Sequence, residues 1–284
     1  MKRSHSPIRG VPGVSANRGL RDDATWLFRR ATSALRILPA FVIIGAQKAG
    51  TTSLHQYLLR SPYVLRALRK EIHYFDRNYA RGEPWYRAHF PTRPAAALAS
   101  RPGTVAITGE ATPYYLFHPD VPDLMARDLP QARIIVLLRD PVARAYSHYQ
   151  HERALGHEPL ELEDALAAER DRLASAPGGS FAHQHHSYIA RGMYATQLSR
   201  WYGHFEQSRV LLLAAEDLFA DPEKVTNRVL DFLGLPPVEL GGVGAHNARS
   251  YTSMGADVRA WLESLYRDEN QRLRAEFGFT APWC

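Results

Sequence analysis

Short apolar runs alternate with longer amphipathic stretches along most of the chain. Four runs rich in Val, Ile and Leu have the length and composition of strands buried on both faces. These runs lie at residues 41–45, 104–109, 133–140 and 209–216. Stretches with helical spacing of apolar residues lie at 51–59, 141–154, 161–174, 193–205, 222–233 and 256–276. The alternation predicts an α/β fold in which helices flank a central parallel sheet in three layers.

Two segments lack clear periodicity, and we expect them to be irregular loops. Residues 77–103 are rich in Arg, Pro and aromatic residues, whereas residues 175–192 combine Gly, Ser and His. Long loops in a compact α/β domain often carry binding functions. Both segments are therefore expected to shape a binding cleft.

Charge divides the chain into a basic N-terminal segment and a neutral remainder. The net charge is +6, and residues 1–36 hold eight basic and two acidic residues, so the rest of the chain is balanced. The first twenty residues are expected to be mobile, and residues 24–38 to include a short amphipathic helix that packs against the domain. We expect a basic, partly disordered tail at 1–36 and a single domain at 37–284. Nucleic-acid binding by so neutral a domain is not expected.

The remaining global features favour a protein of the cytoplasm. No apolar run reaches the ~18 residues that a membrane span needs, and the N-terminus lacks the order of a signal peptide. Cys284 is the single cysteine, which precludes an intrachain disulfide. The oligomeric state does not follow from the sequence.

A glycine-rich loop follows the first apolar run, in the stretch FVIIGAQKAGTTSL. Gly45 and Gly50 keep the glycine spacing of the Walker A loop of nucleotide triphosphatases, but Thr51 stands where that loop has its lysine. The lysine of this chain, Lys48, lies inside the loop instead. A strand, a glycine-rich turn and a helix N-terminus present N–H groups and a positive dipole end to an anion. The stretch predicts a phosphate or sulfate site, and the alternative is a plain turn whose glycines only satisfy backbone angles.

A second polar pair follows the third apolar run, in IIVLLRDPVARAYSHYQ. Arg139 is expected at the carboxyl end of a strand, where open α/β sheets bind ligands. Ser147 lies about two turns along the next helix. A guanidinium and a hydroxyl in this arrangement can both reach one phosphate. The alternative is a surface pair of Arg139 and Asp140 that caps the helix.

Two further stretches hold candidate residues for acid–base chemistry or acceptor binding. RKEIHYFDRNY places Lys70, Glu71, His73 and Asp76 within seven residues, and a carboxylate beside a lysine and a histidine suits general-base work on a hydroxyl. A solvated turn with ordinary charges is the alternative. In TGEATPYYL, Glu110 follows an apolar run, and the two tyrosines after it can line a cleft or belong to the core.

Histidines gather in two places without predicting a metal site. His148 and His151 are three apart on an expected helix, whereas His183, His185 and His186 share a loop. No cysteine accompanies either group. Ordinary structural histidines are the favoured interpretation, and no metal cofactor is expected.

These stretches, in this order, resemble the sulfotransferases that use 3′-phosphoadenosine 5′-phosphosulfate (PAPS). The closest likeness is to the branch that contains the heparan sulfate glucosaminyl sulfotransferases and their bacterial relatives. GAQKAGTTSL resembles that family's 5′-phosphosulfate loop, LLRDPVARAYSHY its 3′-phosphate motif, and KEIHYFD a stretch of the form K-E-x-H-F-F-D. The likeness covers roughly residues 40–275, and it implies a P-loop-like α/β fold.

The resemblance implies how the donor is bound. Lys48 would contact the bridging oxygen, where negative charge grows as the S–O bond breaks. The 5′-phosphosulfate would be bound by Lys48, Ala49, Gly50, Thr51 and Thr52, and the 3′-phosphate by Arg139 and Ser147. A late stretch, HNARSYTSM, resembles a cofactor loop and assigns Arg249 and Tyr251 to PAPS as well. Asn247, Ala248 and Thr252 replace that loop's lysine, glycine and proline.

The resemblance also implies the acceptor side. Glu71 would be the catalytic base for in-line attack of an acceptor hydroxyl on sulfur, with His73 orienting it. Lys70, Asp76 and Glu110 would bind the acceptor, which is expected to be a carbohydrate or another hydroxyl-bearing molecule. The chain departs from the heparan branch where Ala111 replaces a common lysine and where the paired cysteines are absent.

Two other function classes make different demands on the sequence. A P-loop kinase or nucleotide hydrolase would need a lysine at position 51 and a magnesium-binding aspartate after a strand, where this chain has Arg139 before Asp140. A noncatalytic binder of nucleic acid or membranes would act through residues 1–36 alone, because the rest of the chain is neutral. PAPS-dependent transfer of a sulfonyl group to a hydroxyl, without a metal, is the leading hypothesis.

Overall fold

The computed structural model describes residues 16–242 and 254–284, with side chains from residue 24 onward. Its centre is a sheet of five parallel strands in the order β2-β3-β1-β4-β5. The strands are β1 (Phe41–Gly45), β2 (Val64–Leu65), β3 (Ile107–Ala111), β4 (Arg133–Leu138) and β5 (Val210–Ala214). The predicted three-layer α/β fold is thereby confirmed.

The strands form because their side chains are covered on both faces. Every residue of β1 is buried, as are the last five of β4, which is why these runs are apolar without alternation. Gly109 of β3 leaves room for the ring of Phe41, since a Cβ at that position would lie 2.3 Å from the ring. The predicted strand at 104–109 was therefore placed too early: the sheet pairs residues 107–111.

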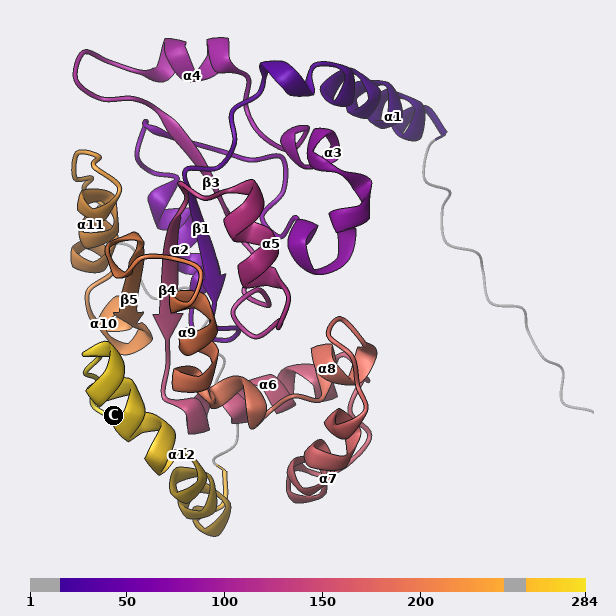
Figure 1. The fold of residues 1–284 in the computed structure, drawn as a ribbon, viewed down its shortest axis with the longest axis vertical. Helices are drawn as coiled ribbons and strands as arrows, with labels where there is room; N and C mark the ends of the chain where they lie inside the picture. The colour runs from indigo at the N-terminus through magenta and orange to yellow at the C-terminus, as the bar shows by residue number, and fades with distance from the viewer. Residues whose placement is uncertain (1–15, 243–253) are drawn as a thin grey trace, which may run out of the picture.

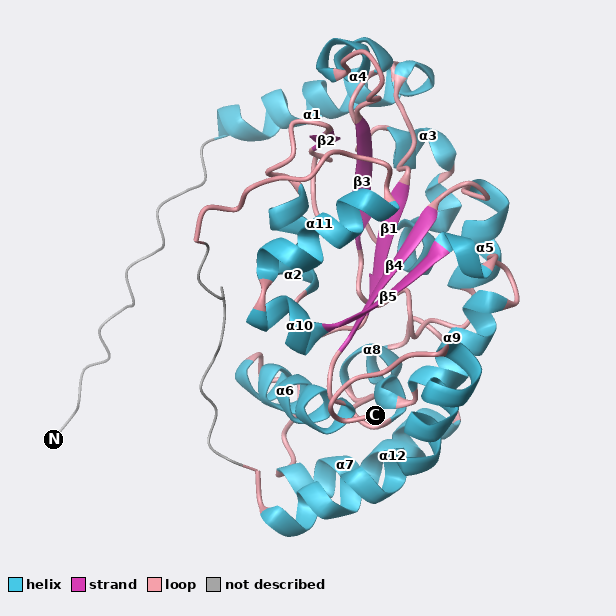
Figure 2. Ribbon diagram, turned by 90° about the vertical axis from the view of Figure 1, so that its left-hand side faces the viewer, coloured by secondary structure: helices cyan, strands magenta, loops and turns pink. Residues whose placement is uncertain are grey.

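Helices cover the two faces of the sheet (Figure 1, Figure 2). Figure 2 shows α2, α10 and α11 on one side, and α5 and α9 on the other. Their bounds are α2 (Thr51–Leu58), α5 (Val121–Asp128), α9 (Tyr194–Tyr202), α10 (Ala215–Ala220) and α11 (Pro222–Phe232). The sheet and its two helical layers form a continuous apolar core that includes Trp201 and Leu230.

Four helices lie beyond the carboxyl ends of the strands, as Figure 1 shows. They are α6 (Pro141–Ala154), α7 (Leu162–Ala174), α8 (Phe181–His185) and α12 (Ala256–Phe277). Pro141 occupies the first turn of α6, where its missing N–H costs nothing, and Asp140 accepts a hydrogen bond from Val142 N at 3.0 Å. These elements wall the edge of the sheet at which ligands bind in open α/β folds.

The opposite end of the molecule carries α1 (Ala16–Ala31), α3 (Glu83–Arg87) and α4 (Arg93–Ala99). Trp26 of α1 contacts Trp85 and His89 edge-on, with ring centroids 6.1 and 4.9 Å apart. Arg36 is 3% exposed and donates to Phe90 O at 2.7 Å. Helix α1 ends at Ala31, whereas the expected helix lay within residues 24–38. As expected, it packs against the domain. The division of the chain at residue 37 stays a prediction.

The expectation of two irregular segments was wrong. Residues 77–103 contain α3 and α4, and residues 175–192 contain α8. These helices have five to seven residues, which is too short for a helical period to show in an 11-residue window. Caps stabilise two of them: Thr92 accepts from Ala95 N, and Ser180 from His183 N.

Among the described residues, no helix is both long enough and apolar enough to cross a membrane.

Candidate active site

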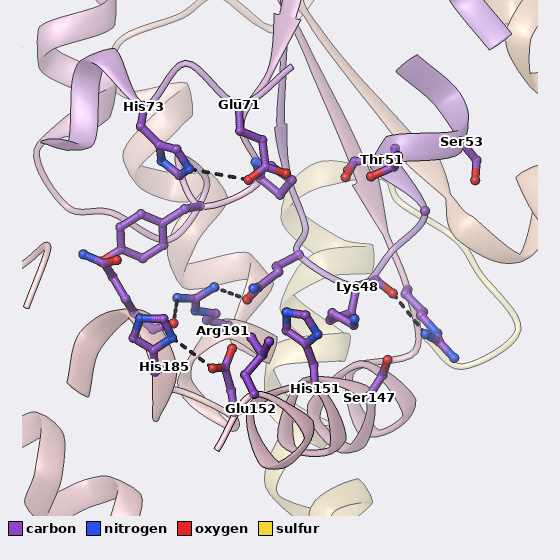
Figure 3. A pocket seen from close by; sticks show the side chains of 18 of the residues that line it. Lys48, Thr51, Ser53, Glu71, His73, Ser147, His151, Glu152, His185 and Arg191 are labelled. Atoms are coloured by element: carbon purple, nitrogen blue, oxygen red, sulfur yellow. Dashed lines mark hydrogen bonds and ion pairs between the residues drawn. The ribbon is translucent and has the colours of Figure 1, made fainter. Parts of the chain in front are cut away.

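A cleft of about 730 Å³ opens at the carboxyl ends of β1, β3 and β4. Figure 3 shows Glu71 and His73 along one wall and Ser147, His151 and Glu152 of α6 along the other. The lining residues are Gln47, Lys48, Gly50, Thr51, Thr52, Ser53, Glu71, His73, Arg77, Pro113, Tyr114, Arg139, Ser147, His151, Glu152, Leu155, Gln184, His185, Arg191 and Phe219. The structure thus brings residues from all four predicted stretches into one cavity.

The loop between β1 and α2 forms the floor of one end of the cleft. Lys48 and Gly50 have positive φ angles of 71° and 92°, so the backbone turns sharply before α2 begins at Thr51. The first N–H groups of a helix have no partner within it and carry the positive end of its dipole. Thr51 is 4% exposed and Ser53 9% exposed, although both line the cleft. The end of the cleft at this loop can therefore bind an anion.

Ala49, predicted to bind the same group, is fully buried and does not line the cleft. Its N–H donates to Ala46 O at 3.2 Å, which closes the turn of the loop. The residue thus supports the shape of the loop in this structure.

Arg139 and Ser147 flank the anion loop from the neighbouring strand and helix. The Arg139 guanidinium donates to Lys48 O at 3.0 Å and lies over the ring of Phe219, 6.0 Å from its centroid. Ser147 is 5% exposed and faces the cleft from α6. The predicted arrangement of a guanidinium at a strand end and a hydroxyl two turns along the next helix is present.

Glu71 lies between two cationic partners. Its Oε1 accepts from Lys70 Nζ at 2.6 Å, and its Oε2 lies 3.5 Å from His73 Nε2. The other ring nitrogen of His73, Nδ1, contacts Asp76 Oδ2 at 2.7 Å. A chain of hydrogen-bonding groups therefore runs from buried Asp76 through His73 to Glu71 at the cleft.

These contacts set the charges of the pair. Burial acts to raise the pKa of Glu71, but the hydrogen bonds and charges of His73 and Lys70 outweigh it and lower that pKa to about 2. Burial acts to lower the pKa of His73, but its hydrogen bonds to Asp76 and Glu71 raise it to about 9. At neutral pH the wall therefore holds a carboxylate beside an imidazolium.

The three residues predicted to bind the acceptor occupy different surroundings. Lys70 does not line the cleft but donates to Glu71, which does. Asp76 has a fully buried side chain that contacts His73. Glu110 is 0% exposed, and its carboxylate accepts from Tyr86 OH at 2.6 Å and Thr112 Oγ1 at 3.1 Å. Burial raises its pKa to about 7. Glu110 thus contacts the core rather than the cleft in this structure.

Arg191 is the main cleft residue that the sequence analysis missed. It is 4% exposed, lies over the Tyr114 ring at 4.8 Å, and donates to Gln47 Oε1 and to Gln184 O. Through Gln47 it ties the anion loop to the segment around α8. No periodicity or motif marks Arg191, because the residues that it contacts across the cleft, Gln47 and Tyr114, lie far away in the sequence.

Other expectations have mixed outcomes. Tyr114 does line the cleft, and its hydroxyl accepts from Gly179 N at 3.1 Å, whereas Tyr115 is buried in the core. Arg249 and Tyr251 lie outside the described residues, so their assignment to the cofactor stays a prediction.

Comparison with known proteins decides the family. The sulfotransferase domain profile matches residues 38–254, more than half of the chain. The chain belongs to the sulfotransferase family. The predicted resemblance is confirmed, and the match favours a sulfotransferase over the kinase or hydrolase considered from the sequence.

Relatives of this sulfotransferase include enzymes of the heparan branch. Human bifunctional heparan sulfate N-deacetylase/N-sulfotransferase 3 is 32% identical over 83% of this chain and 29% of its own length. Mouse heparan sulfate glucosamine 3-O-sulfotransferase 3B1 is 35% identical over 70% of this chain and 46% of its own length. The chain thus spans less than half the length of either relative.

A solved structure supports the same conclusion for the fold. The crystal structure of a sulfotransferase from Alicyclobacillus acidocaldarius superposes on this sulfotransferase with a TM-score of 0.67 at 28% sequence identity. The alignment covers 87% of this chain and 99% of that one.

Proposed function

We propose that this sulfotransferase moves the sulfonyl group of PAPS to a hydroxyl of a carbohydrate acceptor. The observation that supports it is a single cleft with an anion loop, Arg139 and Ser147 at one end and an ionised Glu71 on the facing wall. Bound PAPS would supply an activated sulfonyl group on a phosphate leaving group.

The donor end of the cleft suits the two charged ends of PAPS. The N–H groups at the start of α2 and the hydroxyls of Thr51 and Thr52 would hold the 5′-phosphosulfate. Lys48, at the turn of the loop, would stabilise the negative charge that develops on the leaving oxygen. Arg139 and Ser147 would hold the 3′-phosphate, which a plain nucleotide lacks. Arg249 and Tyr251 complete this proposed set.

Glu71 would accept the proton of the acceptor hydroxyl as its oxygen attacks sulfur. A carboxylate whose pKa is about 2 is a weak base, so one of its partners must leave when the acceptor binds. The 3.5 Å contact to His73 is the longer of the two, and the acceptor hydroxyl would take its place. His73 and Asp76 would then orient the acceptor, with Lys70 holding the other oxygen of Glu71.

The acceptor class rests on the names of the relatives, which act on heparan sulfate. Lys70, Asp76 and Glu110 stay proposed acceptor residues. A screen of sugar, lipid and phenolic hydroxyls with labelled PAPS tests the class, and transfer confined to phenols would contradict a carbohydrate acceptor. A cytoplasmic location stays a prediction, as does transfer without a metal.

The donor assignment is tested by thermal stability in the presence of nucleotides. Adenosine 3′,5′-bisphosphate should raise Tm whereas AMP should not, because only the former carries a 3′-phosphate. Arg139→Ala should remove most of that increase, and Arg127→Ala, an exposed arginine paired with Asp123 on α5, should keep it. Equal stabilisation by the two nucleotides would refute the roles of Arg139 and Ser147.

A further inference from the structure

A carboxylate in the wall of the cleft is surrounded by three imidazoles. Glu152 of α6 is 2% exposed, and its Oε2 lies 2.8 Å from His157 Nδ1 and 2.9 Å from His185 Nδ1. Its Oε1 lies 3.3 Å from His148 Nε2. These side chains come from α6, from the turn after it and from α8, so one carboxylate joins three segments. Figure 3 shows Glu152 beside His185.

We propose that Glu152, His157 and His185 form a binding site for a divalent transition metal, with zinc the best match. Their three ligand atoms lie within 4.8 Å of one another. Two imidazoles and one carboxylate are a ligand set that zinc accepts, and sites with three protein ligands keep a position open for a further ligand. Because Glu152 and His185 line the cleft, that open position would face it.

His148 supplies an independent indication. It is 0% exposed, and neither of its ring nitrogens has a hydrogen-bond partner of good geometry among the described residues. Its Nε2 nevertheless points to the oxygen of Glu152 that the other two histidines leave free. Metal-bound carboxylates are commonly held by such a neighbour, so His148 would fix Oε1 while Oε2 binds the metal.

The observed distances require a small adjustment. Tetrahedral ligands at about 2.1 Å from zinc lie about 3.4 Å apart, so Oε2 would move away from each Nδ1 by roughly half an ångström. His157 and His185 are partly exposed, with 34% and 24% of their side chains accessible, so each ring has one side toward solvent. The nearby Arg191 guanidinium opposes a cation, so we expect weaker binding than at a fully enclosed zinc site.

A metal here would fix the positions of α6 and α8 in the wall of the cleft and would take no part in sulfonyl transfer. It would join α6 to α8, the segment that also supplies Gln184 and the residues around Arg191. Its open position would bind an oxygen ligand, such as a carboxylate of an acceptor. The inference does not depend on the proposed function, because metal binding can be measured without a transfer assay.

Metal content and cobalt absorption test the site on the full chain without a histidine tag. Protein stripped with a chelator should bind one equivalent of Zn²⁺ on dialysis and give the visible bands of a four-coordinate site with Co²⁺. Zn²⁺ should also raise Tm, because a ligand that binds only the folded state stabilises it. The exposed His204 gives the matched control, since His204→Ala should bind Zn²⁺ as the parent does.

Variants of the cluster decide the matter. His157→Asn combined with His185→Asn should lose the bound equivalent, the cobalt bands and the zinc-dependent rise in Tm. His148→Ala should weaken binding by about 10- to 100-fold, as loss of a supporting partner does. Circular dichroism of the metal-free proteins verifies folding, and His157→Asn alone serves if the double variant does not fold. Absence of bound Zn²⁺ in the parent, or equal binding by the double variant, would overturn the proposal.

Discussion

Glu71 illustrates how neighbouring side chains set the protonation state of one candidate base. Lys70 and His73 hold it ionised at a pKa of about 2, while His73 is itself held protonated by Glu71 and Asp76. An isolated carboxylate would be a better base but would have no fixed direction. The arrangement fixes the direction of Glu71 and lowers its strength as a base. Under the proposed function, the acceptor would restore that strength by displacing His73 from Glu71.

Replacing Glu71 with glutamine tests its role as the base. The amide keeps the shape but cannot take a proton, so transfer of labelled sulfate should fall by about 10²- to 10⁴-fold, the usual contribution of general-base catalysis. Stabilisation by adenosine 3′,5′-bisphosphate should persist. Glu83→Gln is the control, because Glu83 is an exposed carboxylate paired with Arg87. Full turnover by the Glu71 variant would exclude it as the base.

The raised pKa of His73 predicts a pH dependence of stability. Its value of about 9 in the folded protein lies above the ordinary value of 6.5, so its contribution is fully present below pH 6.5 and is lost as pH rises through 9. Chemical denaturation at pH 6, 7.5 and 9.5 should show a smaller loss in His73→Asn than in the parent. Parallel stability profiles for the two proteins would contradict the ion pairs described for His73.

At this scale, sequence reasoning selected residues that line the cleft where they lie in one short stretch of the chain, and their roles stay predictions. Lys48 and Glu71 each lie in a short stretch whose residue types indicate their chemistry. Arg191 could not be found in this way, because its partner Gln47 is 144 residues away. Glu152 has the nearby partners His148 and His157, but its contact with His185, 33 residues away, arises only from the fold. Glu110 was expected to follow a strand, but it lies within β3 and faces the core, which the sequence alone does not indicate.

At the scale of elements, the anion loop contains two left-handed residues, Lys48 and Gly50. Gly50 has a φ of 92°, and a Cβ there would lie 2.9 Å from the Phe219 ring, which also lines the cleft. A side chain at position 50 would therefore strain the backbone and displace the Phe219 ring from the wall of the cleft. The short loop between β1 and α2 tolerates only glycine at this position.

Gly50→Ala should lower the free energy of unfolding by about 1–2 kcal/mol, the cost of a left-handed non-glycine residue, and should also weaken binding of adenosine 3′,5′-bisphosphate. Gly103→Ala is the matched control, since Gly103 has a φ of 81° and open space around it. It should lose similar stability and keep nucleotide binding, as measured by denaturation and titration. Unchanged nucleotide binding in Gly50→Ala would show that the Phe219 ring can move without disturbing the nucleotide site, which would contradict the expected loss.

Elements were predicted well where they are long. β1 and β4 are continuous apolar runs, the second predicted at 133–140 and observed at 133–138, and α6 has 14 residues, so all three could be read from one sequence. β2 has two residues and α8 five, so neither shows a period. Their positions follow from tertiary contacts, such as the pairing of Val64 with Ile107 in β3.

At the scale of the whole molecule, the cleft and the helix α1 lie at opposite ends of the sheet. The cleft lies at the carboxyl ends of the strands, whereas α1, α3 and α4 lie at the other end (Figure 1). The contacts of Trp26 with Trp85 and His89 hold α1 to the body far from the anion loop. Changes at that end should therefore affect folding and leave ligand binding intact.

Trp26→Ala should lower the free energy of unfolding by about 0.5–1.5 kcal/mol for each of its two ring contacts. Phe28→Ala, on the same helix but 65% exposed, should change it by less than about 0.5 kcal/mol. Nucleotide binding should be equal in both variants and the parent. A loss of binding in Trp26→Ala would mean that the two ends of the molecule are coupled.

The link between Arg191 and Gln47 also has a consequence for engineering. The anion-loop end of the cleft is made by the loop after β1 with Arg139 and Ser147, whereas part of the opposite end is made by one continuous segment that supplies Gln184, His185 and Arg191. A segment of this kind can be exchanged between relatives as a cassette, provided that its last residues still present an arginine to Gln47. The contacts of this segment with Gln47, Tyr114 and Arg77 are the points at which an exchanged wall would have to fit the rest of the cleft.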